Sequence, residues 1–378
     1  MSQSLSPRWQ VRAMRPVAYD IAYVDDIFDP ANPALLSMGR VDGGRRFVVV
    51  DETVLGYHGA RIRHYFAQQR IEACVLPFSG GEAGKSIAAW RGVLDVLDQF
   101  PIHRRDEPIL AIGGGVLTDV VGFVASSYRR GVPHIKVPTT LMGLVDAAIG
   151  VKAGINFNGS KNRLGSFEPP ARVLLDRALL RTLPWRHLAN GLCEIIKLAL
   201  IKDATLFGML ERNGAACLAD AMQGEAGHAI LDRAIDGMLE ELAPNLFEAE
   251  LARAVDFGHT FSPGLESRYE AELLHGEAVL LDMLVSSVIA QRRGLLAGAD
   301  ALCILNLPTR LGIQPALECL DVERMWQSLL ERIEHRNGLQ RVPLPAAIGV
   351  CHFVNDITRD EIANAIVALR EWMIRTDE

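Results

Sequence analysis

The sequence has few cysteines and no long apolar run, and both shortages narrow the class of protein. Its six cysteines are scattered and include no C-x-x-C pair, which is typical of reduced thiols in a cytoplasmic protein. No segment approaches the roughly 18 consecutive apolar residues of a membrane span. The opening stretch carries charges throughout and lacks the apolar core of a secretory signal. We therefore expect a cytoplasmic protein that does not enter a membrane.

Basic residues are also in short supply. The chain has 39 lysines and arginines against 46 aspartates and glutamates, which gives a formal net charge of −7. A general affinity for nucleic acid or for an anionic membrane needs a positive surface, so neither is expected as a partner. The 378 residues, 49% of them hydrophobic, are enough for two domains or for one large α/β enzyme.

Strand and helix patterns divide the chain into two halves. The first half alternates helical segments with short β-branched runs, which are typical of buried parallel strands. The expected strands are 46–51, 73–78, 108–115, 134–140 and 172–176. Asn158-Gly159 adds a hairpin signal. After about residue 176, most segments have apolar residues at helical spacing. The sequence predicts an α/β domain over residues 1–178 and an α-helical domain over residues 179–378.

Two glycine-rich turns in the first half indicate a nucleotide site. GGGVLTD, from Gly113 to Asp119, lies between an expected strand and an expected helix. Bare backbone can approach a phosphate there, and a helix N-terminus favours the anion. SGGEAGKS offers Glu82 for ribose hydroxyls and Lys85 for phosphate charge. A tight turn without a ligand, or an exposed loop, explains either segment alone, but two such loops in one parallel sheet favour a dinucleotide.

The next segment, from residue 128 to 162, is rich in polar side chains. Lys152 follows the apolar run AAIGV, an unusual place for a cation unless an anion binds it. Arg129 and Arg130 are adjacent and face different ways, so only one of them is expected to reach a site. The polar residues of interest here are Arg130, Thr139, Thr140, Asp146, Lys152, Lys161 and Asn162.

A metal site is a further candidate. Glu194 and Lys197 are three residues apart in an otherwise apolar helical segment, so they share one helix face, and buried charges need partners or a metal. Glu194, His259 and His275 together would leave open positions on Zn²⁺ for substrate oxygens. The spacing alone leaves this open, because two histidines and a glutamate far apart in sequence are unrelated in most proteins.

Taken together, the motifs resemble those of one enzyme family. In order along the chain they are GGEAGKS, GGGVLTDVVGF, YRRGV, VPTTL, D-x5-K, KN, an E-x2-K helix, GHTF and HGEAV. The same order is found in the dehydroquinate synthase-like sugar phosphate cyclases. The resemblance implies a Rossmann-like N-terminal parallel-sheet domain, an all-α C-terminal domain, tightly held NAD⁺, one Zn²⁺ or Co²⁺, and a homodimer.

The resemblance also implies roles for individual residues. The implied metal ligands are Glu194, His259 and His275. The implied NAD⁺ contacts are Asp51, Glu82, Lys85, Gly114, Gly115, Asp119, Thr139, Thr140, Lys161 and Thr182. The implied substrate and catalytic set is Asp146, Lys152, Asn162 and Lys197. Arg130 is implied as a phosphate ligand that reaches in from the neighbouring subunit.

Departures from the family pattern concern the substrate. Dehydroquinate synthases have R-x3-N-x2-H-x3-H where this chain has Ala252, Asp256, His259 and Pro263. The metal histidine is kept, but groups that would hold a substrate carboxylate are lost, and Asp256 joins the expected catalytic set. Arg253 lies one residue from the missing arginine and cannot be assumed to replace it. The roles of Glu241, Arg253 and Arg336 stay open.

DFGHTFSP and HRNGLQRVPLP resemble the 2-epi-5-epi-valiolone synthase branch, which acts on sedoheptulose 7-phosphate. The implied lyase reaction combines transient oxidation by NAD⁺, phosphate elimination, re-reduction and intramolecular aldol cyclisation. The alternatives are a sister cyclase (2-epi-valiolone, desmethyl-4-deoxygadusol or dehydroquinate synthase), a metal-dependent polyol dehydrogenase and a catalytically silent nucleotide-binding protein. Product stereochemistry and the native metal stay open.

Overall fold

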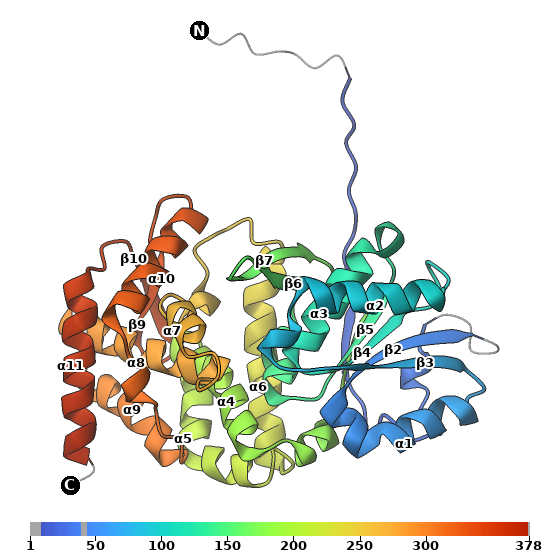
Figure 1. Ribbon diagram of the computed structural model, residues 1–378. Helices are drawn as coiled ribbons and strands as arrows, with labels where there is room; N and C mark the ends of the chain where they lie inside the picture. The colour runs from blue at the N-terminus through green and yellow to red at the C-terminus, as the bar shows by residue number, and fades with distance from the viewer. Residues whose placement is uncertain (1–8, 39–43, 377–378) are drawn as a thin grey trace.

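The computed structural model describes residues 9–38 and 44–376, so both outer ends of the two expected domains lie outside it. A six-stranded sheet organises the first half, in the order β1-β8-β5-β4-β2-β3 with every neighbouring pair parallel (Figure 1). Its strands are β1 (Asp20–Tyr23), β2 (Arg45–Asp51), β3 (Glu72–Phe78), β4 (Ile109–Gly113), β5 (His134–Pro138) and β8 (Arg172–Leu175). The five expected strands are present, while the short edge strand β1 was not expected.

Alternating side chains explain why helices cover both faces of this sheet. On β2, Val48 and Val50 pack in one apolar cluster, while Phe47 and Val49 pack in another on the opposite face, as the two-residue period of a strand requires. Helix α1 belongs to the first cluster, and α2 and α3 belong to the second. These helices are α1 (Glu52–Gln68), α2 (Ile87–Gln99) and α3 (Gly115–Ser127).

A β-hairpin projects beside α3. It consists of β6 (Lys152–Phe157) and β7 (Ser160–Phe167), paired antiparallel. Asn158 and Gly159 connect the strands with positive φ angles of 49° and 76°, which suits a tight turn with right-handed strand twist. The hairpin signal in the sequence is therefore confirmed. In Figure 1 the hairpin lies between the sheet and the helical half.

The second half is mainly helical, which confirms the expected fold class. Its helices are α4 (Trp185–Ile201), α5 (Ala204–Ala219), α6 (Glu225–Leu242), α7 (Ser262–Arg268), α8 (His275–Arg292), α9 (Gly298–Arg310), α10 (Val322–His335) and α11 (Arg359–Thr376). One antiparallel pair, β9 (Val342–Ala347) and β10 (Val350–Val354), interrupts the expected all-helical pattern. Pro343 and Pro345 in β9 disfavour a helix there. Among the described residues, no helix has the length and apolar character needed to cross a membrane.

Close packing at one glycine joins the two halves. A Cβ added to Gly191 on α4 would lie 2.5 Å from Met142 N and 2.6 Å from Leu141 Cβ. Such distances are below contact, so only glycine lets α4 approach this backbone. This close approach also fixes the position of Glu194, which lies one turn further along the same helix.

We expect Gly191→Ala to lower the free energy of unfolding by about 1–3 kcal/mol, because α4 must move away from Leu141 and Met142. The matched control is Gly237→Ala on α6, where the nearest atom to an added Cβ is 4.0 Å away. Alanine is the better helix former, so the control should be stabilised by up to about 1 kcal/mol. Urea denaturation measures both, and equal midpoints for the two variants would contradict the packing argument.

Candidate metal and nucleotide site

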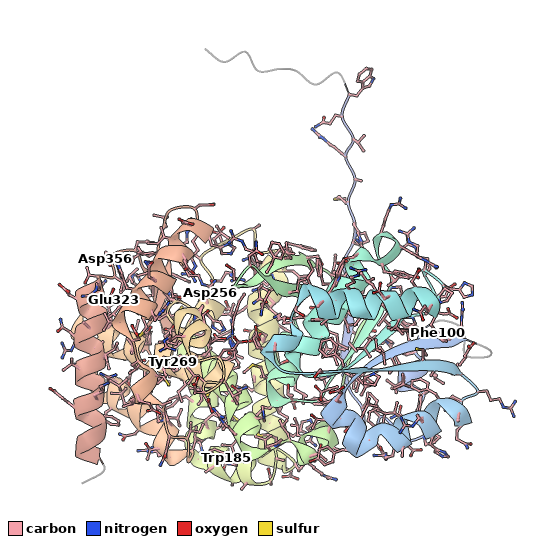
Figure 2. All side chains as sticks on the ribbon, in the orientation of Figure 1. Phe100, Trp185, Asp256, Tyr269, Glu323 and Asp356 are labelled. Atoms are coloured by element: carbon pink, nitrogen blue, oxygen red, sulfur yellow. The ribbon has the colours of Figure 1, made fainter. Side chains whose placement is uncertain are left out.

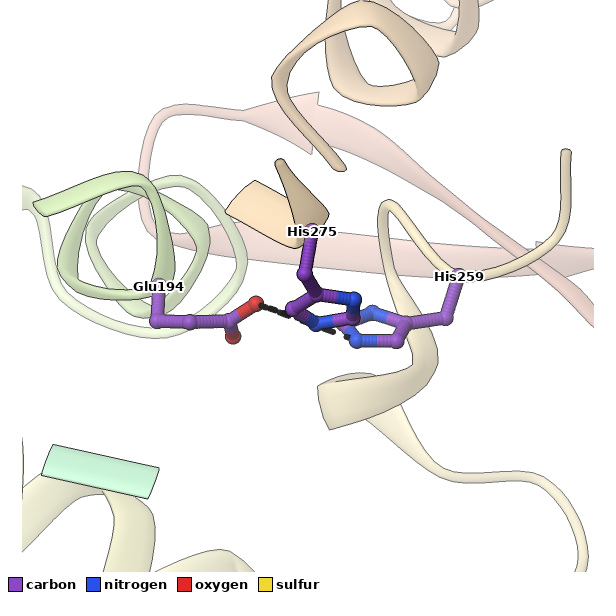
Figure 3. Close-up of side chains that lie close together, drawn as sticks. All are labelled: Glu194, His259 and His275. Atoms are coloured by element: carbon purple, nitrogen blue, oxygen red, sulfur yellow. Dashed lines mark ion pairs between the residues drawn. The ribbon is translucent and has the colours of Figure 1, made fainter. Parts of the chain in front are cut away.

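The structure brings Glu194, His259 and His275 together (Figure 3). Glu194 comes from the middle of α4, His259 from the loop before α7, and His275 from the first turn of α8. Glu194 Oε1 is 3.8 Å from His259 Nε2 and 3.4 Å from His275 Nε2. The candidate ligand atoms of the three residues all lie within 4.8 Å of one another.

The other ring nitrogen of each histidine is held in place. His259 Nδ1 is 3.1 Å from the carbonyl oxygen of Phe257, and His275 Nδ1 is 3.1 Å from Glu266 Oε1. An Nδ1–H that donates to an oxygen fixes the tautomer and leaves Nε2 as the donor atom for a metal. Both Nε2 atoms accordingly face the carboxylate of Glu194.

The donor groups at this point suit a bound cation. Glu194 is fully buried beside Lys197, and neither of its carboxylate oxygens has a hydrogen-bond partner of normal geometry. Burial and the Lys197 charge lower the pKa of His259 to about 3, so this imidazole is neutral. Burial opposes a charge on His275, but Glu266 and Glu194 raise its pKa to about 10. A divalent cation would replace that proton, and one carboxylate with two imidazoles suits Zn²⁺.

Lys197 connects the metal candidates to Asp146. Its ammonium contacts Glu194 and lies 3.5 Å from Asp146 Oδ2, and its side chain is only 2% exposed. Asp146 lies in the turn Gly143–Ala147 after β5. Desolvation raises the pKa of Asp146, while Lys197 lowers it and Glu194 raises it further. Two residues expected in catalysis therefore lie directly beside the three metal candidates.

A second charged group surrounds Asp256. This carboxylate contacts Arg253 and lies 3.0 Å from Arg336 Nη2. Burial opposes its charge, but Arg253 and Arg336 lower the pKa of Asp256 to about 2. Arg253 also contacts Glu248, which in turn contacts Lys152. Arg253, Arg336 and Lys152 thus all face carboxylates of the chain itself.

The residues expected to bind a nucleotide follow the carboxyl ends of neighbouring strands. Asp51 ends β2 and caps α1 through the amides of Thr53 and Val54. Seven more follow β3, β4 and β5 in turn, namely Glu82 and Lys85, then Gly114, Gly115 and Asp119, then Thr139 and Thr140. The other two expected contacts lie elsewhere, Lys161 on β7 and Thr182 before α4. Strand order reverses between β2 and β4. Ligands of open α/β sheets bind outside the carboxyl ends of strands at such a reversal.

Ion pairs and hydrogen bonds join these loops. Lys85 contacts Asp119. Glu82 Oε1 accepts a hydrogen bond of 2.7 Å from Asn156 Nδ2 on β6. Lys161 Nζ on β7 is 3.7 Å from Glu82 Oε1 and 2.9 Å from Glu266 Oε2.

Arg130 and Thr182 lie apart from the closely packed groups. Arg130 is exposed on the turn after α3, at the opposite end of this 13-residue helix from Gly115. A helix of that length spans about 20 Å. Thr182 ends the turn before α4 and donates to the carbonyl oxygen of Leu179. Asn162 is exposed on β7, where its backbone N–H donates to Asn156 Oδ1.

Models of known protein families match two adjoining parts of this sequence. Residues 75–190 match the family described as 3-dehydroquinate synthase N-terminal, and residues 191–332 match 3-dehydroquinate synthase C-terminal. The chain belongs to the 3-dehydroquinate synthase family.

Several relatives within the family have names that specify one reaction. The chain is 47% identical to a 2-epi-5-epi-valiolone synthase of Streptomyces albus, over 97% of this chain and 91% of that protein. It is also 47% identical to a protein of the same name from an Actinoplanes species, over 94% and 92%. The solved structure of ValA, the 2-epi-5-epi-valiolone synthase of Streptomyces hygroscopicus subsp. jinggangensis 5008, superimposes with a TM-score of 0.92 at 44% identity. That match covers 96% of this chain and 99% of the other, which was solved with NAD⁺ and Zn²⁺ bound.

His259 lies in a loop, and α7 begins only at Ser262. Pro263 occupies the first turn of α7, where a missing N–H costs nothing. Asp282 on α8 accepts hydrogen bonds from the amides of Phe261 and Ser262 and from Ser286 Oγ. This fully buried carboxylate anchors the loop that carries His259.

Sequence reasoning missed three polar residues of the site, namely Glu248, Glu266 and Asp282. Glu266 had a weak signal, because it lies between two candidate metal histidines in sequence and a carboxylate can supply an oxygen for a histidine Nδ1. Nothing in the sequence connected Glu248 with Lys152, which are 96 positions apart (248 − 152).

We expect Asp282→Ala to lower the free energy of unfolding by about 2–5 kcal/mol, because two buried amides lose their acceptor. Ser286→Ala is the matched control, since it removes only a hydroxyl that donates to Asp282, and it should cost about 1 kcal/mol. Thermal unfolding followed by circular dichroism measures both. A loss for Asp282→Ala no larger than the control's would reject the anchoring role.

Proposed function

We propose that the protein is a 2-epi-5-epi-valiolone synthase, a carbon–oxygen lyase that converts sedoheptulose 7-phosphate to 2-epi-5-epi-valiolone and phosphate. The observation that carries this proposal is the Glu194, His259 and His275 cluster beside Lys197 and Asp146, within a chain 44–47% identical to proteins of that name. NAD⁺ and one divalent metal, Zn²⁺ or Co²⁺, are the proposed cofactors.

When bound, NAD⁺ would accept and return a hydride, and the metal would polarise a substrate oxygen as a Lewis acid. Glu194, His259 and His275 would hold the metal. Lys197 and Asp146 are placed to orient a substrate hydroxyl next to it and to move its proton. Lys197 and Asp146 are 3.5 Å apart, so a proton passed from the ammonium to the carboxylate neutralises both groups and leaves their summed charge unchanged.

The phosphate of the substrate would bind at Lys152 and Asn162. In the structure Glu248 contacts Lys152, so a phosphate oxygen would take the place of that carboxylate. Arg130 is exposed on the turn after α3, and the family resemblance implies that a second copy of the chain supplies it to this phosphate, in a homodimer. Residues 1–178 would form the NAD⁺ domain, and residues 179–378 would form the metal and substrate domain.

NAD⁺ would lie across the strand ends. Gly114 and Gly115 begin α3, where bare backbone and the helix N-terminus suit the pyrophosphate. Asp51 and Glu82 can accept from ribose hydroxyls. The other proposed contacts are Lys85, Asp119, Thr139, Thr140, Lys161 and Thr182.

Charge pairing near Asp256 favours a neutral substrate end over a carboxylate. Arg253 and Arg336 both face Asp256, and Arg253 also faces Glu248. Guanidiniums paired in this way have little net charge to offer a substrate carboxylate. The polyol end of a heptulose phosphate, by contrast, can exchange hydrogen bonds with the Asp256 group.

The deciding experiment incubates the protein with sedoheptulose 7-phosphate, NAD⁺ and Zn²⁺ and identifies the product by NMR. We expect 2-epi-5-epi-valiolone, release of one phosphate, and no lasting rise of absorbance at 340 nm, because the hydride is returned. A stable NADH signal would instead identify a polyol dehydrogenase. A different cyclitol would identify a sister cyclase.

Lys152→Ala should lower the rate of phosphate release by at least about 100-fold while NAD⁺ still binds, because a phosphate-binding cation is lost. Lys202→Ala is the control, since Lys202 pairs with Glu241 at the far end of α4, and its rate should stay near wild type. Near-normal turnover of Lys152→Ala would exclude Lys152 from the phosphate site.

His275→Ala should abolish stoichiometric metal binding, because two remaining ligands hold Zn²⁺ poorly. His228→Ala is the control, as His228 is exposed on α6 and pairs with Asp232. Elemental analysis after dialysis gives the metal content. An unchanged content in His275→Ala would show that the metal lies elsewhere.

A further inference from the structure

Four side chains form a continuous polar chain from the glycine loop to the metal candidates. Glu82 follows β3, Lys161 lies on β7, Glu266 lies on α7 and His275 begins α8. Lys161 Nζ is 3.7 Å from Glu82 Oε1 and 2.9 Å from Glu266 Oε2. Glu266 Oε1 completes the connection at 3.1 Å from His275 Nδ1. This series of polar contacts thus links elements from both halves of the molecule.

Glu266 is the most buried of these four side chains. Its side chain is 7% exposed, against 24% for Lys161 and 28% for Glu82. Its Oε1 contacts His275 and its Oε2 contacts Lys161, so a rotation of the carboxylate that breaks one contact also breaks the other. Ion pairs removed from water in this way are stronger than surface pairs. A shift of Lys161 is therefore transmitted to the ring of His275.

The other end of this series of polar contacts is Glu82, in the glycine-rich loop after β3. Asn156 Nδ2 donates to Glu82 over 2.7 Å, and Asn156 Oδ1 accepts from the Asn162 amide over 2.9 Å. Glu82 is thereby tied to the β6–β7 hairpin that carries Lys161. Ribose hydroxyls that donate to Glu82 would hold its carboxylate still, and would keep Lys161 directed at Glu266.

We propose that Glu266 is a positioning residue for His275, and that Lys161 couples it to the nucleotide loop so that NAD⁺ raises the affinity for the metal. This inference rests on the proposed function, because it takes NAD⁺ and a divalent metal as the ligands. An Nδ1–H held by a carboxylate orients the imidazole and strengthens Nε2 as a ligand. Linkage requires that the metal raise the affinity for NAD⁺ by the same factor.

The test measures Zn²⁺ affinity by competition with a chelating dye, on full-length protein stripped of metal and nucleotide, with and without saturating NAD⁺. We expect NAD⁺ to raise the wild-type affinity by at least about fivefold, within the usual range of coupling between sites. Lys161→Gln should reduce this ratio to about one. Glu266→Gln should do the same, and should also weaken Zn²⁺ binding without NAD⁺ by about 10–100-fold.

Arg310→Gln is the control, because Arg310 pairs with Glu211 on the surface and should keep the wild-type ratio. A ratio of one in the wild type, or an undiminished ratio in Lys161→Gln and Glu266→Gln, would overturn the coupling. If Lys161→Gln no longer binds NAD⁺, the ratio of Zn²⁺ affinities measured in Glu266→Gln decides whether the two sites are coupled, because that variant retains Lys161. Failure of the wild type to bind either ligand would instead refute the proposed function.

Discussion

A carboxylate without access to water lies at the centre of this molecule. Glu194 is fully buried on α4, and an ionised group in such a place is costly unless opposite charge compensates it. Lys197 supplies one positive charge from the next turn, and the imidazoles of His259 and His275 approach from the other side. The candidate ligand atoms of Glu194, His259 and His275 converge within 4.8 Å of one another, where a divalent cation would bind. The proposed cofactor, substrate and coupling all depend on the position of this one side chain.

Packing rather than polar contacts places that side chain. Gly191 lets α4 approach the backbone at Leu141 and Met142, just before the turn that carries Asp146. Gly276 has the same effect on α8, since a Cβ there would lie 2.0 Å from the carbonyl oxygen of Asn190. Close-packed interiors transmit small displacements instead of absorbing them. The absence of a side chain at Gly191 and Gly276 thus lets α4 and α8, which carry Glu194 and His275, pack closely against their neighbours. Figure 2 shows the side chains on the ribbon in both halves.

The pairing of charged side chains in the site indicates which substrate groups it can bind. Arg253 and Arg336 are held by Asp256, while Lys152 faces Glu248. Lys152 is the more exposed of these cations, with 59% of its side chain accessible, so an incoming anion can reach it without desolvating the whole group. A phosphate at Lys152 and hydroxyls near Asp256 are therefore compatible with one substrate, a sugar phosphate without a carboxylate.

The sequence alone predicted the α/β half, the helical half, the Asn158-Gly159 hairpin and most of the candidate site residues. Strand and helix periods, turn residues and ordered motifs are local features, so they can be seen before the chain folds. Tertiary structure alone decided that Lys161 meets Glu266, that Glu248 meets Lys152 and that Pro263 lies in the first turn of a helix. Contacts of this kind join residues that are far apart in sequence, and their geometry follows from how whole elements pack.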